Sequence, residues 1–227
     1  MGKKYKLTEE TINVYGRTLH RIESLRDFGN IKKGDKGGFI ENEDNLSQWD
    51  NCWVYDNAKV YNDAVVYGNA EVFSDAVVCE CACVFGNAMV YGDAKVCGDA
   101  KVCGDAMVYG NAMVFKNAMV YGNACVFGDA EIYDNVRVYG NAEVFGNVHI
   151  KGDADISSIS DYIFFKNWWS SGRCFTWTRS NNMWSVGCFY GTGKELIEKA
   201  YKDSELSGRE YKRVVDYVES VLKEIKS

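Results

Sequence analysis

The sequence predicts a mainly β protein built around a left-handed parallel β-helix, with a short β cap before it and an α+β module after it. Seventeen consecutive six-residue blocks run from Val54 to Asp155 without insertion or deletion. The chain also contains no proline, which would remove a ladder hydrogen bond from a strand in such a stack. We expect the cap to span residues 1–41, the β-helix 42–159 and the module 160–227.

The N-terminal segment has the pattern of two short strands joined by a turn. Ile12 to Val14 and Thr18 to Ile22 flank Gly16, and a glycine-rich stretch then leads into the first coil. A β-helix leaves unpaired strand edges and apolar side chains at its first coil. We therefore expect this segment to cover that end.

The six positions of a block hold Val or Ile, an aromatic residue, Gly, Asn or Asp, Ala and a variable residue. Side chains alternate along an extended segment, so the Val and Ala positions face inward while the aromatic and variable positions face outward. Gly and Asn or Asp reach positive φ at low cost and supply a corner. Three blocks close one coil of eighteen residues, and successive coils stack with parallel pairing.

The C-terminal module has apolar segments separated by turn residues, which predicts three antiparallel strands, the third running from Met183 to Tyr190. Two helices follow. Thr192 with Glu195 and Ser207 with Glu210 both fit the capping-box pattern that starts a helix.

Composition indicates a chain that works in the cytoplasm of a bacterium or of an infected bacterial cell. It has neither an apolar run long enough to span a bilayer nor a signal-peptide pattern. Nine cysteines favour reduced thiols. Cys97 lies one coil above Cys79, but parallel neighbours are expected to be poorly oriented for a disulfide. The net charge of −6 is concentrated in the β-helix.

One outward column is aromatic in every coil. Counting every eighteen residues gives Tyr55, Phe73, Tyr91, Tyr109, Phe127 and Phe145. Met89 and Met107 run beside its middle, and a monomer seldom exposes an apolar strip of this extent. We predict self-association, as a dimer or trimer, through Met89, Tyr91, Met107, Tyr109 and Phe127. The alternative is that the rings only stack on one another within the ladder.

Arginine and tryptophan gather in the C-terminal module. Because these residue types dominate interface hot spots, we predict a protein partner there. The predicted contact residues are Trp168, Arg173, Trp177, Arg179 and Trp184. The alternative is that a module of this size needs its aromatic residues for its own core.

The repeated Val-Tyr-Gly-Asn-Ala blocks resemble the hexapeptide-repeat superfamily. The stretch Gly37-Gly38-Phe39-Ile40-Glu41 is similar to uncharacterised repeat proteins of bacterial and prophage genomes, some of them labelled polymer-forming or acyltransferase. The resemblance implies the β-helix fold. For acyltransferases it also implies a histidine base and an acyl-CoA bound between subunits. Here the only candidate base in the repeats is His149, which could meet Glu131 one coil below on the same face. The alternative, which we favour, is that His149 is a solvated surface histidine.

Three functions are compatible with these patterns. We favour a non-enzymatic oligomeric scaffold that presents the C-terminal module, encoded by a phage and directed at a host defence factor. The alternative is a CoA-dependent acyltransferase, and the third is an acidic mimic of nucleic acid, based on the negative β-helix. We predict no cofactor, no metal, no membrane contact and no direct binding to nucleic acid. Lys194 lies in a helix start rather than a phosphate loop, because the pattern lacks its first Gly.

Overall fold

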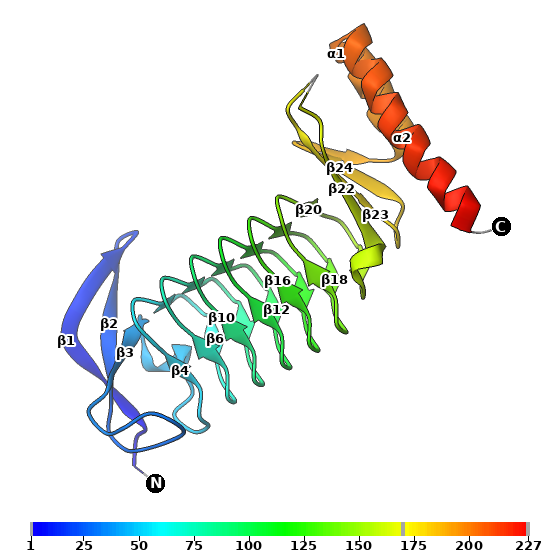
Figure 1. The fold of residues 1–227 in the computed structure, drawn as a ribbon. Helices are drawn as coiled ribbons and strands as arrows, with labels where there is room; N and C mark the ends of the chain where they lie inside the picture. Colours follow the sequence, from blue (N-terminus) through cyan, green and yellow to red (C-terminus); the bar gives the residue numbers. More distant parts are fainter. Residues whose placement is uncertain (1, 169–170, 226–227) are drawn as a thin grey trace.

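A computed structural model of the chain describes residues 2–168 and 171–225. Stacked coils form a prism, and further elements project from both of its ends (Figure 1). A β-hairpin projects at the N-terminal end, and a sheet with two helices projects at the C-terminal end. Within these ranges, no helix combines the length and apolar character needed to cross a bilayer.

The N-terminal cap is a hairpin that continues into the first coil. Strands β1 (Tyr5–Val14) and β2 (Arg17–Ser24) pair antiparallel, and β2 pairs with β3 (Lys36–Ile40). Strand β3 pairs in parallel with β5 (Lys59–Val60) of the β-helix. The short helix η1 (Glu43–Asn45) follows. Cap side chains share one buried cluster with those of the coils. The predicted cap is confirmed, with strands longer than the sequence pattern indicated.

Three parallel sheets form the faces of the prism. The first face continues the cap and contains β5 (Lys59–Val60), β8 (Val77–Val78), β11 (Lys95–Val96), β14 (Met113–Val114), β17 (Glu131–Ile132) and β20 (His149–Ile150). The second contains β4 (Trp53–Val54), β7 (Glu71–Val72), β10 (Met89–Val90), β13 (Met107–Val108), β16 (Cys125–Val126) and β19 (Glu143–Val144). The third contains β6 (Val65–Val66), β9 (Cys83–Val84), β12 (Lys101–Val102), β15 (Met119–Val120), β18 (Arg137–Val138) and β21 (Asp155–Ile156).

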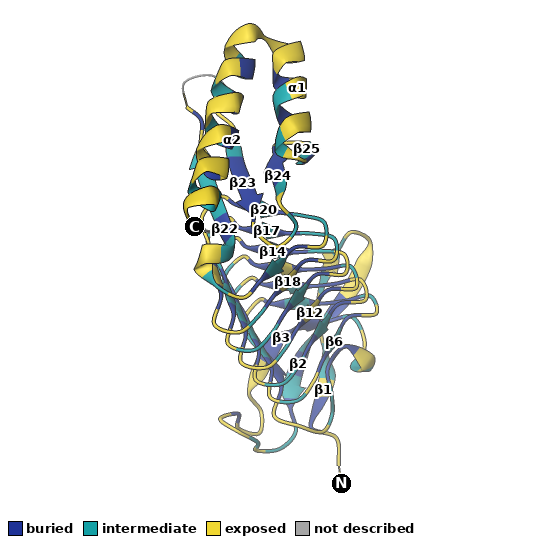
Figure 2. Cartoon of the chain, turned by 90° about the vertical axis from the view of Figure 1, so that its right-hand side faces the viewer, coloured by how far each residue is buried: buried dark blue, intermediate teal, exposed yellow. Residues whose placement is uncertain are grey.

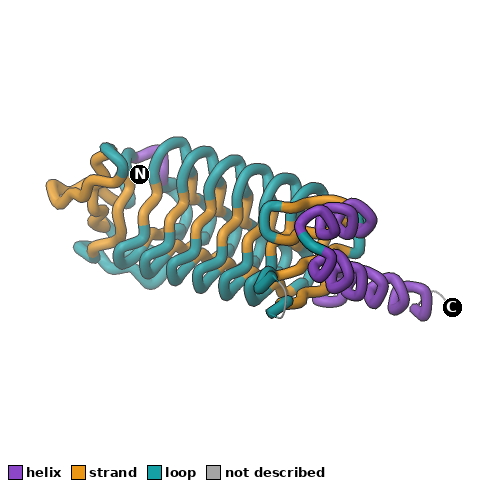
Figure 3. The backbone as a smooth tube through the Cα atoms, turned by 90° about the horizontal axis from the view of Figure 1, so that it is seen from above, coloured by secondary structure: helices purple, strands orange, loops and turns teal. Residues whose placement is uncertain are grey.

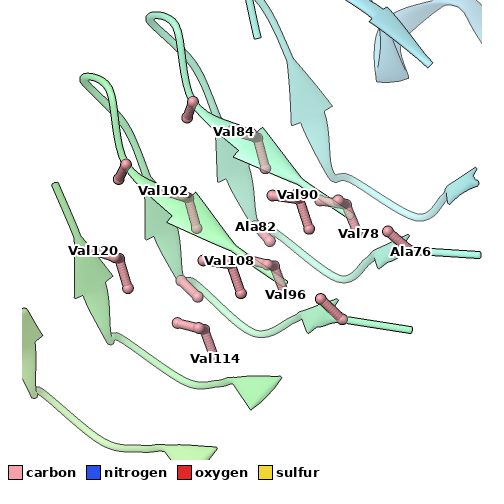
Figure 4. Close-up of a cluster of buried hydrophobic side chains, with 14 of the residues drawn as sticks. Ala76, Val78, Ala82, Val84, Val90, Val96, Val102, Val108, Val114 and Val120 are labelled. Carbon is pink, nitrogen blue, oxygen red and sulfur yellow. The ribbon is translucent and has the colours of Figure 1, made fainter. Parts of the chain in front are cut away.

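Valine and alanine fill the axis of the prism. Val90, Val96 and Val102 point inward from the three faces (Figure 4) and are fully buried, as is Ala82. The outward positions are intermediate or exposed over most of the prism (Figure 2). The predicted inward and outward assignment is therefore confirmed. Burial of the branched side chains, about 1.5 to 3 kcal/mol each, stabilises the stack as a whole.

Glycine suits most corners for two reasons, although six corners hold another residue at positive φ, among them Ser74 and Lys116. Gly104 has a φ of +73°, and a Cβ added to it would lie 3.0 Å from the backbone of Gly122 in the next coil. At the position after the glycine, Asn and Asp side chains of successive coils form ladders of hydrogen bonds along each corner. The Asn87 amide, for example, donates a hydrogen bond of 2.9 Å to the Asp105 carboxylate. The corners thus hold coils at close backbone spacing.

The C-terminal module is an antiparallel sheet covered by helices. After η2 (Ile159–Asp161), its strands are β22 (Tyr162–Lys166), β23 (Cys174–Thr178), β24 (Met183–Val186) and β25 (Phe189–Gly191). The predicted third strand divides in two at a turn where Gly187 has a φ of +56°. The α+β module is confirmed with this additional strand.

Two helices complete the chain, and they lie together beyond the last coil (Figure 3). Helix α1 (Gly193–Asp203) begins at the predicted capping box of Thr192 with Glu195. Helix α2 (Glu205–Ile225) begins earlier than predicted, because the Ser204 hydroxyl, and not that of Ser207, accepts a hydrogen bond from the start of the helix. The predicted capping box at Ser207 was wrong, because Ser204 directly follows α1 and caps the second helix three residues earlier.

The module also closes the last coil. Backbone N–H groups at the end of the β-helix donate to side chains of the module: His149 to the Thr176 hydroxyl at 3.1 Å, and Asp155 to the Ser180 hydroxyl at 2.8 Å. These contacts satisfy strand-edge groups that would otherwise pair with another chain.

Candidate functional site

The aromatic column forms a continuous ladder on the second face. Centroids of Phe73 and Tyr91 lie 4.6 Å apart with the rings within 4° of parallel, and those of Tyr91 and Tyr109 lie 4.8 Å apart within 2°. The stack continues to Phe127 and Phe145 at spacings of 4.9 and 5.2 Å. The spacing is that of the coils, so each ring lies against its neighbours.

Stacking does not remove this column from the surface. Tyr91, Tyr109 and Phe127 stay half-buried, and Phe145 is 39% exposed. Met89 and Met107 lie side by side in paired strands next to the rings, and both are half-buried. The five residues predicted for self-association therefore form one contiguous apolar strip, with rings that also support one another.

A second candidate site is a groove of about 530 Å³ on the first face. Polar side chains from successive coils line it, and its lining residues are Asp75, Asp93, Lys95, Asn111, Met113, Asp129, Glu131, Asn147 and His149. All nine residues fall on two columns at eighteen-residue spacing, one at a corner and one along the strands. Four carboxylates face a single lysine in the groove, so its charge is negative.

His149 meets Glu131 at the C-terminal end of this groove, as the coil register predicted. Nδ1 of His149 lies 2.7 Å from Oε2 of Glu131, and Nε2 lies 3.2 Å from Oδ1 of Asn147. The Tyr133 hydroxyl donates to the same carboxylate at 3.0 Å. Burial and this carboxylate together raise the pKa of Tyr133 to about 12. Both ring nitrogens thus face side-chain oxygens: Glu131 orients the imidazole as a partner of a base would, while Asn147 occupies the nitrogen that would take a proton from a substrate.

The other histidine has a local structural contact. Nδ1 of His20 lies 3.0 Å from the carbonyl oxygen of Thr8 across the β1–β2 hairpin. His20 therefore supports the cap and is remote in the fold from the His149 groove.

The structure separates the residues predicted to contact a partner in the C-terminal module. Trp177 and Trp184 are each 2% exposed and belong to the core between the sheet and the helices. Nε1 of Trp177 donates to the Asn182 side chain at 2.9 Å. For these two residues the core alternative is the one that the structure supports. Trp168 is 78% exposed, and Arg173 and Arg179 are also exposed.

Cys79 and Cys97 form a disulfide between neighbouring coils, with their Cα atoms 4.8 Å apart. The expectation that parallel neighbours are poorly oriented for a disulfide was wrong for this pair, whose Cα separation falls within the range of protein disulfides. The bond lies in a small cluster with Leu19 and Phe39 of the cap and Tyr61. Among the described residues, no three His, Cys, Asp or Glu side chains are placed so that they could hold one metal ion together.

Sequence reasoning did not predict the cavity at the start of the aromatic ladder. It has a volume of about 360 Å³ and is lined by Asn30, Tyr55, Asp56, Glu71 and Phe73. Asn30 belongs to the irregular loop between β2 and β3, which no repeat places against the coils. The sequence signal that was available is the carboxylate pair Asp56 and Glu71 beside two aromatic residues in the first coils.

The fold and these surfaces define the chain as a capped parallel β-helix protein with an α+β module at its C-terminal end. No protein-family model and no curated protein matches the chain.

Proposed function

We propose that this protein is a non-enzymatic, oligomeric β-helical scaffold that presents its C-terminal module to a protein partner. The observation that carries the proposal is the apolar strip of Tyr91, Tyr109, Phe127, Met89 and Met107. Packing this strip against a second copy removes apolar surface from water at about 25 cal/mol per Å². The rings are already ordered by stacking, which lowers the entropy cost of the association.

The partner surface lies on the module. Trp168 and Arg173 lie in the connection between β22 and β23, and Arg179 follows the other end of β23. Their aromatic and guanidinium groups are the residue types that dominate interface hot spots. The resemblance to repeat proteins of prophage genomes supports a host factor, such as a defence protein, as the target. In the native host, the triple variant Trp168→Ala, Arg173→Glu, Arg179→Glu should lose a partner that the wild-type chain captures. Retention of that partner by the triple variant would contradict this assignment.

Self-association is tested by a matched pair of charge substitutions. Met107 and Met119 occupy the same outward position on the second and third faces, and both are half-buried. Light scattering at tens of micromolar should give a dimer or trimer for the wild type and for Met119→Glu, and a lower mass for Met107→Glu. A monomeric wild type, or an unchanged mass for Met107→Glu, would contradict the proposal.

The acyltransferase is the second candidate, favoured by the distance of 2.7 Å between His149 and Glu131. Two features fit it less well. Residues 53–156, all of them described, carry no loop inserted between coils. The groove beside His149 also has four carboxylates, which repel the phosphate groups of an acyl-CoA. Titration calorimetry with acetyl-CoA decides between the candidates, since heat that is lost in His149→Ala would favour the enzyme.

A further inference from the structure

The cavity at the start of the aromatic ladder combines two ring surfaces with two carboxylates. The rings of Tyr55 and Phe73 are nearly perpendicular, at 87° with centroids 6.4 Å apart. From Phe73 onward the rings of this column lie within 16° of parallel. The ladder therefore turns at this one step, and the turn leaves a concave corner of aromatic surface.

Hydrogen bonds fix the two carboxylates at this corner. The Tyr55 hydroxyl donates to Oε1 of Glu71 at 3.1 Å, and the Ser74 N–H donates to Oδ2 of Asp56 at 3.0 Å. The pKa of Tyr55 is raised to about 12, by burial first and then by the charge of Glu71. A hydrogen bond therefore orients each carboxylate, and each has a second oxygen that can accept from a ligand.

The N-terminal loop supplies the remaining wall. Phe28 packs edge-on against Trp53 with centroids 5.4 Å apart, which holds the loop over the first coil. Asn30 follows two residues later and lines the cavity with its exposed side chain. The cavity thus lies where loop coverage ends and the ladder begins, so a molecule that covers the ladder reaches it directly.

We propose that this cavity binds a guanidinium group, as carried by an arginine side chain of a protein partner. A guanidinium is planar and weakly hydrated, stacks on aromatic rings and donates in a fork to carboxylates. Those properties match two rings and two oriented carboxylates better than a compact ammonium does. The inference goes beyond the self-association proposed above and does not depend on it.

Next to this cavity, the chain already binds one of its own guanidinium groups with an aromatic ring and an oxygen atom of Asp56. The Arg21 guanidinium lies 4.2 Å from the centroid of the Phe39 ring, and its Nη1 donates to the carbonyl oxygen of Asp56 at 2.9 Å. Arg21 donates to the backbone carbonyl oxygen of Asp56 and not to its carboxylate. The carboxylate of the same residue faces the cavity, where a second guanidinium would occupy the other side of the corner.

The test uses N-acetyl-arginine amide as the probe and N-acetyl-citrulline amide, which has the same shape without the charge, as its control. Titration calorimetry should give saturable binding of the arginine probe to the wild-type chain. Loss of one charge-assisted hydrogen bond corresponds to about a tenfold weaker affinity or more. We expect this loss for the citrulline probe, for Glu71→Gln and for Asp56→Asn.

Glu143→Gln is the matched control variant. Glu143 occupies the same outward column of the second face as Glu71, beside Phe145 at the other end of the ladder and outside the cavity. The affinity of the Glu143→Gln variant for the arginine probe should equal that of the wild type. No saturation with the wild type, equal binding of the two probes, or wild-type affinity in both cavity variants would overturn the proposal.

Light scattering on the same variants identifies the source of the arginine. If Glu71→Gln weakens both the probe and the assembly, a second copy of this chain supplies the guanidinium. If it weakens the probe alone, a different protein supplies it. Both outcomes retain the cavity as a guanidinium site.

Discussion

The close approach of coils at the corners gives the sharpest prediction about the fold. Gly104 and Gly146 have similar backbone angles, with φ of +73° and +80°. A Cβ at position 104 would lie 3.0 Å from the nitrogen and oxygen of Gly122, whereas a Cβ at position 146 would meet nothing within 4 Å. Alanine at the two positions therefore shares the φ strain and differs only in the contact with the next coil.

The magnitudes follow from these contacts. Strain at positive φ costs about 1 to 2 kcal/mol, and reduced freedom of the unfolded chain returns about 0.4 to 1 kcal/mol. Gly146→Ala should therefore destabilise by about 1 kcal/mol. Overpacking adds about 1 to 3 kcal/mol at position 104. The neighbours cannot move freely, because Asn87 N–H donates to the Gly104 carbonyl and Asp105 N–H to the Gly122 carbonyl, each at 2.8 Å. Gly104→Ala should thus destabilise by about 2 to 4 kcal/mol.

Equilibrium unfolding in urea, followed by far-ultraviolet circular dichroism, measures both variants against the wild type. The midpoint should fall further for Gly104→Ala than for Gly146→Ala. Equal midpoints for the two variants would show that backbone spacing between coils does not constrain the corner residue, and the reasoning would fail.

Two further predictions concern covalent and ionic links between coils. Alkylation of the unfolded, unreduced chain should label seven of the nine cysteines, and nine labelled thiols would contradict the disulfide. Reduction should lower the free energy of unfolding by about 3 kcal/mol, since the Cys79–Cys97 bond closes a loop of 18 residues. A hydrogen bond from Lys116 holds the pKa of Asp134 below its usual value. The stability that the Asp134 carboxylate contributes should therefore be complete at neutral pH and be lost below about pH 4. Acid titrations monitored by circular dichroism should show a smaller loss of stability in Asp134→Asn than in the wild type.

The six-residue period determined the β-helix because every block encodes the same local geometry. Inward valine, corner glycine and outward rings each follow from positions a few residues apart, and the eighteen-residue register brings His149 next to Glu131, a contact that the sequence allowed but did not favour. The capping box at Thr192 was equally local. These features were predictable because their physical causes lie within one coil or one turn of helix.

Tertiary structure alone decided what lies outside the repeat. The burial of Trp177 and Trp184 depends on how α1 and α2 fold back on the sheet, and no period encodes that docking. The cavity at Glu71 exists because a loop around Asn30 ends at that coil. The disulfide between Cys79 and Cys97 depends on how two outward side chains turn toward each other on stacked coils, which the register does not specify. Contacts with segments outside the repeat fix the first two features, and side-chain orientation within the repeat fixes the third.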